Sequence, residues 1–91
     1  MKIKKLAIMP YAQAHVEIMD NNSIMLFSYV TRVAEIDEDG WLTVYGLYSA
    51  TTRRHISAFM REYTKFDYSI AKQCYNDKKI INIYTGEVRD F

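Results

Sequence analysis

Apolar and polar residues in the first half of the chain follow the two-residue period of β-strands. Residues 15–19 alternate strictly, which predicts a strand with one buried face. Residues 3–9 form a candidate edge strand that Pro10 ends, because proline cannot donate to a strand ladder. Residues 20–22, Asp-Asn-Asn, predict a turn, since these side chains bond their own backbone and tolerate positive φ.

A long β-biased run follows at residues 23–36. Its length predicts either a bent or bulged strand or two strands in sequence. Residues 37–40, Asp-Glu-Asp-Gly, predict a hairpin turn with Gly40 in the left-handed position. We expect residues 41–48 to form the returning strand and residues 79–84 a final strand.

The second half changes to the period of a helix. One narrow apolar stripe consists of Ile56, Phe59, Met60 and Tyr63, at spacings i, i+3, i+4 and i+7. Three residues are competent to cap the start of this helix: Ser49, Thr51 and Thr52. We expect Asp67 to cap a second, shorter helix that runs to about Tyr75. Its inward residues are expected to be Ile70, Ala71 and Cys74.

These elements predict one α+β domain over residues 1–91. We expect an antiparallel sheet of four to five strands with one or two helices packed on one face. The expected filling between the layers is aromatic: Phe27, Tyr29, Trp41, Tyr45 and Phe59.

Composition narrows the class of protein. Nearly half of the 91 residues are apolar, which is enough for a core, and the net charge of +1 is unlike that of a DNA mimic or a nucleic-acid coat. Cys74 is the only cysteine, so we expect a reducing compartment. No apolar run approaches the length of a membrane span. We therefore expect a protein of the host cytoplasm with no membrane partner.

The charges are segregated along the chain. An acidic cluster consists of Glu35, Asp37, Glu38 and Asp39, and the main helix carries Arg53, Arg54, Arg61 and Lys65. We interpret both groups as candidate binding residues. The helical period places Arg54, Arg61 and Lys65 opposite the apolar stripe as an exposed basic ridge. Arg53 lies beside the stripe, and we expect it to pair with an acid of the hairpin or with a backbone carbonyl.

Arginines at the start of a helix are locally unfavourable, because that end of the macrodipole is positive. An acidic group should therefore lie opposite them. It can come from a loop of this protein or from a partner, and the residues leave both alternatives open.

Candidate catalytic and metal-binding residues are few. His15, His55 and Cys74 can ligate zinc, but no two of them stand at a recognised ligand spacing, so we expect no metal site. His55 could be combined with Ser49 and an acid of residues 35–39, but no glycine-flanked elbow presents a nucleophile. We expect a protein that is not an enzyme and has no catalytic residues and no cofactor.

Two kinds of binding remain. The basic ridge and the Ser/Thr-rich helix start could contact phosphates of a nucleic acid. Alternatively, the protein could dock on another protein, since tyrosine and arginine are enriched at interface hot spots. Four of the eight tyrosines lie near element ends, where we expect partial exposure: Tyr11, Tyr68, Tyr75 and Tyr84.

Two segments carry a resemblance to a known family. The first is Ser28-Tyr29-x-Thr31-x-Val33-Ala34, and the second is Gly46-x-Tyr48-Ser49-x-Thr51-Thr52-Arg53-Arg54-His55-Ile56, followed by Phe59 and Tyr63. Over residues 24–63 the chain resembles small uncharacterised proteins carried by phages and mobile elements of Gram-positive bacteria. Ser-x-Thr-Thr-Arg-Arg-His is the specific part. The chain departs from the pattern at Arg32, where proline is expected.

The resemblance implies context and no chemistry, since the family has no established activity. Small stand-alone proteins of such elements are often anti-defence factors, including anti-CRISPR inhibitors. The resemblance therefore implies a stoichiometric inhibitor of a host defence protein, with a Cas9-type effector as the first candidate partner. The runner-up interpretation is a small nucleic-acid-binding accessory protein.

Overall fold

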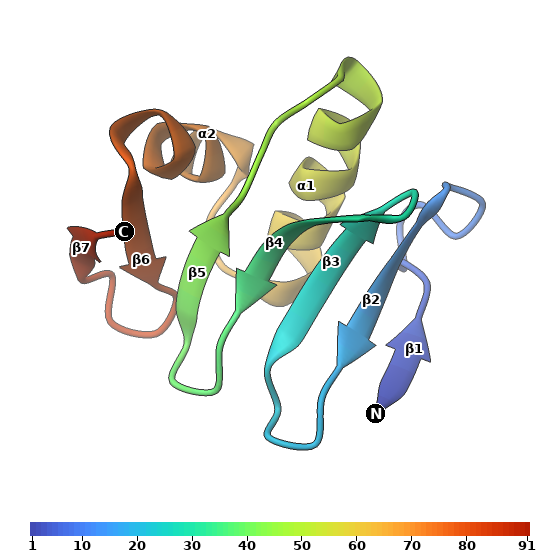
Figure 1. The fold of residues 1–91 in the computed structure, drawn as a ribbon, viewed down its shortest axis with the longest axis horizontal. Helices are drawn as coiled ribbons and strands as arrows, with labels where there is room; N and C mark the ends of the chain where they lie inside the picture. The colour runs from blue at the N-terminus through green and yellow to red at the C-terminus, as the bar shows by residue number, and fades with distance from the viewer.

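The computed structural model describes residues 1–91 and contains one antiparallel sheet of seven strands in chain order. The strands are β1 (Lys2–Lys4), β2 (Ala14–Ile18), β3 (Ile24–Ser28), β4 (Thr31–Ile36), β5 (Trp41–Val44), β6 (Lys79–Asn82) and β7 (Val88–Asp90). Helices α1 (Ala50–Tyr63) and α2 (Tyr68–Asp77) connect β5 to β6 and cover one face of the sheet (Figure 1). Neither helix has the length and apolar character needed to cross a bilayer.

The predicted α+β class with helices on one face is confirmed, but the predicted number of four to five strands is too low. Residues 23–36 form two strands, which was one of the two alternatives, and Tyr29 and Val30 turn the chain between them. The last strand, β7, was not predicted. It is three exposed residues long, and only its pairing with β6 makes it a strand.

Several strands end earlier than the pattern predicts. The first stops at Lys4 and β5 stops at Val44, where the chain leaves the sheet to reach α1. β6 ends at Asn82 because this side chain organises a turn. Its Oδ1 accepts the backbone N–H groups of Tyr84 and Thr85, and its Nδ2 donates to the Asp39 carbonyl.

Side chains define the helix ends. Ser49 is the cap of α1 among the three candidates, and its Oγ accepts the N–H of Thr52 at 3.2 Å. The helix ends where the Thr64 N–H and hydroxyl both donate to the Met60 carbonyl. Asp67 caps α2 as predicted, and α2 continues two residues beyond Tyr75 to Asp77.

The core between the layers is mainly aliphatic. Ile56, Phe59 and Met60 of the predicted stripe are fully buried, and Tyr63 is partly buried beside them. The prediction of an aromatic filling is correct only for Phe59. The other four aromatic residues lie outside the core cluster: Phe27, Tyr29, Trp41 and Tyr45.

The phase of each strand explains this error. Leu42 pairs with Ile36 and points inward, so its neighbour Trp41 points to the open face. The rings on that face have local partners: His15 stacks on Phe27 at 4.9 Å between centroids, and Arg89 lies 3.9 Å from the Trp41 centroid.

We predict that Phe59→Ala lowers the free energy of unfolding by about 3 to 5 kcal/mol, because Phe59 is fully enclosed between α1 and the sheet. Phe27→Ala is the control and should cost clearly less, since Phe27 is partly exposed on the open face. Urea denaturation measures both. Equal losses would contradict the observed phase of β3 and α1.

Candidate interaction surface

A buried polar cluster joins β3 to the start of α1. Ser28 is the last residue of β3, and its Oγ lies 2.8 Å from His55 Nδ1 and 3.1 Å from Thr52 Oγ1. The Ser49 hydroxyl donates to Thr52 Oγ1 at 3.3 Å. Ser28, Thr52 and His55 are all buried. The cluster therefore satisfies three buried polar side chains and fixes the rotation of α1 on the sheet.

His55 is a packing residue in this arrangement. Burial lowers the pKa of the imidazole below its ordinary value, which favours the neutral ring. Its serine partner is Ser28, whereas the catalytic combination considered from the sequence placed Ser49 beside His55. Because both Ser28 and His55 are enclosed, the pair attaches the helix to the strand and leaves no hydroxyl exposed to a substrate.

Two exposed tyrosines near the cluster have a backbone conformation in the left-handed region, with positive φ. Tyr29 has φ 57° and is 53% exposed, and Tyr48 has φ 41° and is 64% exposed. Positive φ is an outlier for a bulky side chain and costs about 1–2 kcal/mol per residue. Such strain persists only where the surroundings impose it, and it clusters at functional sites.

Local contacts hold both tyrosines in place. The Tyr29 N–H donates to the Gln13 carbonyl at 2.7 Å, and the Tyr29 ring lies 6.0 Å from the His55 ring. The Tyr48 ring lies over Gly46, where any Cβ would overlap it. We call these two tyrosines, together with Val30, which is 92% exposed, the tyrosine rim. They belong to the β3–β4 turn and to the loop before α1, and their chain neighbours Ser28 and Ser49 both contact Thr52.

The basic residues of α1 lie toward both of its ends: Arg53 and Arg54 are near its start, and Arg61 is in its last turn. Arg53, Arg54 and Arg61 are exposed, and no ion pair of the structure includes any of them. Exposure of Arg54 was predicted and is confirmed. The predicted pairing of Arg53 is wrong in both of its alternatives. The acidic hairpin between β4 and β5 and the start of α1 lie at opposite ends of the sheet (Figure 1), and the side chains that donate to backbone carbonyls are those of Thr64 and Asn82.

The predicted ridge is also shorter than expected. α1 ends at Tyr63, so Lys65 does not continue the helical phase of Arg54 and Arg61. It lies exposed beyond the helix, with its Nζ 5.7 Å from the Phe66 ring centroid.

A shallow groove of about 360 Å³ separates α1 from the loop between β1 and β2. Its lining residues are Ile8, Met9, Arg54, Ser57, Ala58 and Arg61. The Glu62 carboxylate accepts the Ala7 N–H at 2.7 Å, which attaches the loop to the helix. This hydrogen bond holds the loop that carries Ile8 against α1.

The predicted acidic residues divide into structural and free groups. Asp37 Oδ1 accepts the N–H groups of Asp39 and Trp41, both at 2.9 Å, and so shapes the turn. Glu35 lies on the open face, where it accepts the Tyr45 hydroxyl at 3.0 Å. Glu38 and Asp39 are exposed at the hairpin tip. The predicted acidic and basic residues therefore do not form one site.

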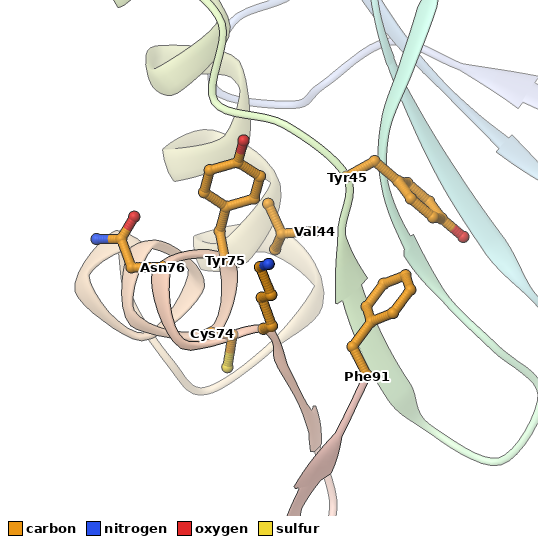
Figure 2. A pocket seen from close by; sticks show the side chains of 7 residues that line it. Val44, Tyr45, Cys74, Tyr75, Asn76 and Phe91 are labelled. Atoms are coloured by element: carbon orange, nitrogen blue, oxygen red, sulfur yellow. The ribbon is translucent and has the colours of Figure 1, made fainter.

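A second cavity, of about 460 Å³, lies between the end of β5 and the end of α2. Figure 2 shows the Tyr45 and Phe91 rings on one side and Cys74, Tyr75 and Asn76 of α2 on the other. Burial, with a contribution from Asp77, raises the pKa of the Cys74 thiol. This cysteine therefore favours the protonated thiol and is a poor nucleophile.

The three candidate metal ligands lie in different parts of the fold. His15 is on the open face, with Nε2 3.0 Å from a Glu17 oxygen. His55 belongs to the buried cluster, and Cys74 lies on the buried side of α2. Each of them has a local packing or hydrogen-bonding role.

The chain is a small α+β protein in which two helices cover one face of a seven-stranded antiparallel meander. Residues 3–82 match a family of unknown function, DUF8033, and the chain belongs to this family. Comparison with curated proteins and with solved structures gives no match.

The main residues that sequence reasoning did not assign to the site are Ser28, Tyr29, Tyr48 and Ile8. Three of them belong to the two segments that carry the resemblance, so that signal was present in the sequence. Their convergence was not readable, because Ser28 and His55 are 27 residues apart and meet only through the packing of α1.

We predict that His55 makes stability fall as the pH drops below neutrality. The unfolded chain binds a proton near the ordinary pKa of 6.5, whereas burial delays protonation in the folded state. Urea denaturation across this range should show the slope in the wild type and in His15→Gln. His55→Gln should flatten it, and an unchanged slope would show that another group titrates.

Proposed function

We propose that this protein acts by stoichiometric binding to a host protein and performs no catalysis. The observation that supports this most directly is the tyrosine rim. Exposed Tyr29 and Tyr48 occupy backbone conformations in which glycine or asparagine would be cheaper, and a buried polar cluster stabilises the frame beneath them. Strain retained at exposed aromatic residues is expected where those side chains contact a partner.

The composition of this end of the molecule also favours a protein partner. Tyrosine and arginine carry a large share of the energy at protein interfaces, and here both types are exposed near the start of α1. Because the frame is hydrogen-bonded in the free protein, binding does not carry the additional cost of ordering a backbone loop.

The proposed partner class is a host defence protein, and a Cas9-type effector is the first specific candidate. The resemblance to proteins of phages and mobile elements supports this choice. Cas9-type effectors also carry broad basic channels that hold nucleic acid. The near-neutral charge and the exposed tyrosines of this protein suit a protein surface of such an effector beside these channels.

The second candidate function is nucleic-acid binding along α1. It is favoured by exposed arginines that have no carboxylate partner within the protein. Against it stands the shortened ridge, which retains Arg54 and Arg61 on one helical line but not Lys65.

We predict that Tyr29→Asn separates binding from stability. Asparagine tolerates the left-handed conformation, so the free energy of unfolding should stay within about 1 kcal/mol of the wild-type value. Affinity for a partner captured from nuclease-treated host lysate should fall about thirty-fold, as for a hot-spot residue. Tyr84→Asn, at an exposed tyrosine between β6 and β7, should retain full affinity.

A purified Cas9-type effector provides the specific test. We predict that the protein blocks target cleavage at a near-equimolar dose and that Tyr29→Asn relieves this block. Full cleavage in the presence of excess wild-type protein would remove the Cas9-type effector as a partner. Equal capture by the wild type and Tyr29→Asn would contradict the role of the tyrosine rim.

Salt dependence distinguishes the nucleic-acid alternative. If α1 binds phosphates, affinity for free DNA should fall steeply as the salt concentration rises and should weaken in Arg54→Ala and Arg61→Ala. Under our proposal, affinity for free DNA is negligible and the captured protein survives nuclease treatment. Recovery of nucleic acid alone would favour the alternative.

A further inference from the structure

We infer that the groove between α1 and the β1–β2 loop binds an acidic segment of the partner protein that carries one apolar side chain between two carboxylates. This inference rests on the proposed function and names the chemistry of the segment that the partner presents. Three features of the groove carry it: the two arginines on α1, the exposed Ile8 that faces the short side chains between them, and the hydrogen bond that holds the loop against α1.

The two arginines define the charge of the segment. Arg54 and Arg61 are seven residues apart on α1, which places their backbones about 10 Å apart on one line along the helix. Neither forms an ion pair within the protein. The nearby Glu62 carboxylate accepts a hydrogen bond from Ala7 and pairs with neither arginine. Carboxylates are the natural partners of such guanidinium groups.

The apolar surface selects a peptide over a phosphate backbone. Ser57 and Ala58 lie between the arginines, and their short side chains leave the hollow that the groove occupies. Ile8 borders it and is 53% exposed. An aliphatic side chain would bury this surface, whereas a chain of phosphates would leave it uncovered and would desolvate its own charge against it.

The groove is formed before binding. The Ala7–Glu62 hydrogen bond and the fully buried Leu6 hold the loop against α1. Met9 packs on the core cluster from the same loop. A segment can therefore bind without the cost of ordering the loop.

The geometry suggests a direct probe. In an extended peptide, side chains at alternate positions face the same side, and the first and fifth are about 13 Å apart. The acetylated and amidated peptide Glu-Thr-Leu-Thr-Glu therefore presents two carboxylates and one leucine to the groove. Gln-Thr-Leu-Thr-Gln removes the charges, and Glu-Thr-Ser-Thr-Glu removes the apolar anchor.

The test is a titration of the isotope-labelled full chain followed by amide chemical shifts. We expect saturable shifts centred on residues 8, 54, 57, 58 and 61, and affinity about five-fold lower for each control peptide, as for the loss of modest surface contacts. Arg54→Gln and Arg61→Gln should weaken binding similarly. Arg53→Gln is the matched control, since Arg53 is equally exposed on α1 but does not line the groove.

Three results would overturn the inference: no shifts in the groove, equal binding of the charged and the Gln peptide, or stronger groove binding of a short oligothymidylate than of the peptide. Its failure can be distinguished from failure of the proposed function. If Arg54→Gln and Arg61→Gln still capture the partner while Tyr29→Asn does not, the groove assignment fails and the proposed function stands. If the peptide binds the groove but no host protein is captured, the groove assignment stands and the proposed function fails.

Discussion

The hydrogen bond between Ser28 of β3 and His55 of α1 is the interaction on which the arrangement of this molecule depends. It lies between the layers and, with Thr52, sets the rotation of the helix on the sheet. That rotation encloses Ile56, Phe59 and Met60 and leaves Arg53, Arg54 and Arg61 outside. The same cluster lies directly below Tyr29, so it connects the stability of the fold to the shape of the exposed surface.

The charges at the start of α1 follow from this frame. Arginines near the positive end of a helix are unfavourable, and the sequence left open whether this protein or a partner supplies the opposing acid. The acidic hairpin does not reach them (Figure 1), and Asp37 and Glu35 are already hydrogen-bonded where they lie. No acid of that hairpin therefore opposes these arginines, and their unpaired charge is the physical argument for the proposed docking.

Local periodicity was sufficient to predict the helices and the alternating faces of β2, but not the inward faces of β3 and β5. The stripe of α1, the Asp67 cap and the left-handed Gly40 each depend on a few neighbouring residues. The inward face of β5 depends on its register with β4, and β7 is a strand only because it pairs with β6. Both features depend on contacts between strands and cannot be read from a local pattern. The site was only partly predictable for the same reason. Its basic residues were visible in the sequence, whereas the groove with Ile8 required the packed loop.

We propose that the end of the molecule at the start of α1 contacts a host protein. Site-specific photocrosslinking tests it most directly, with p-benzoylphenylalanine in place of Tyr48 or of Tyr84 in host cells. These positions are similarly exposed but belong to different loops, before α1 and between β6 and β7. We expect a crosslinked host protein from position 48 and none from position 84. Adducts from position 84 alone, or from neither position, would contradict it.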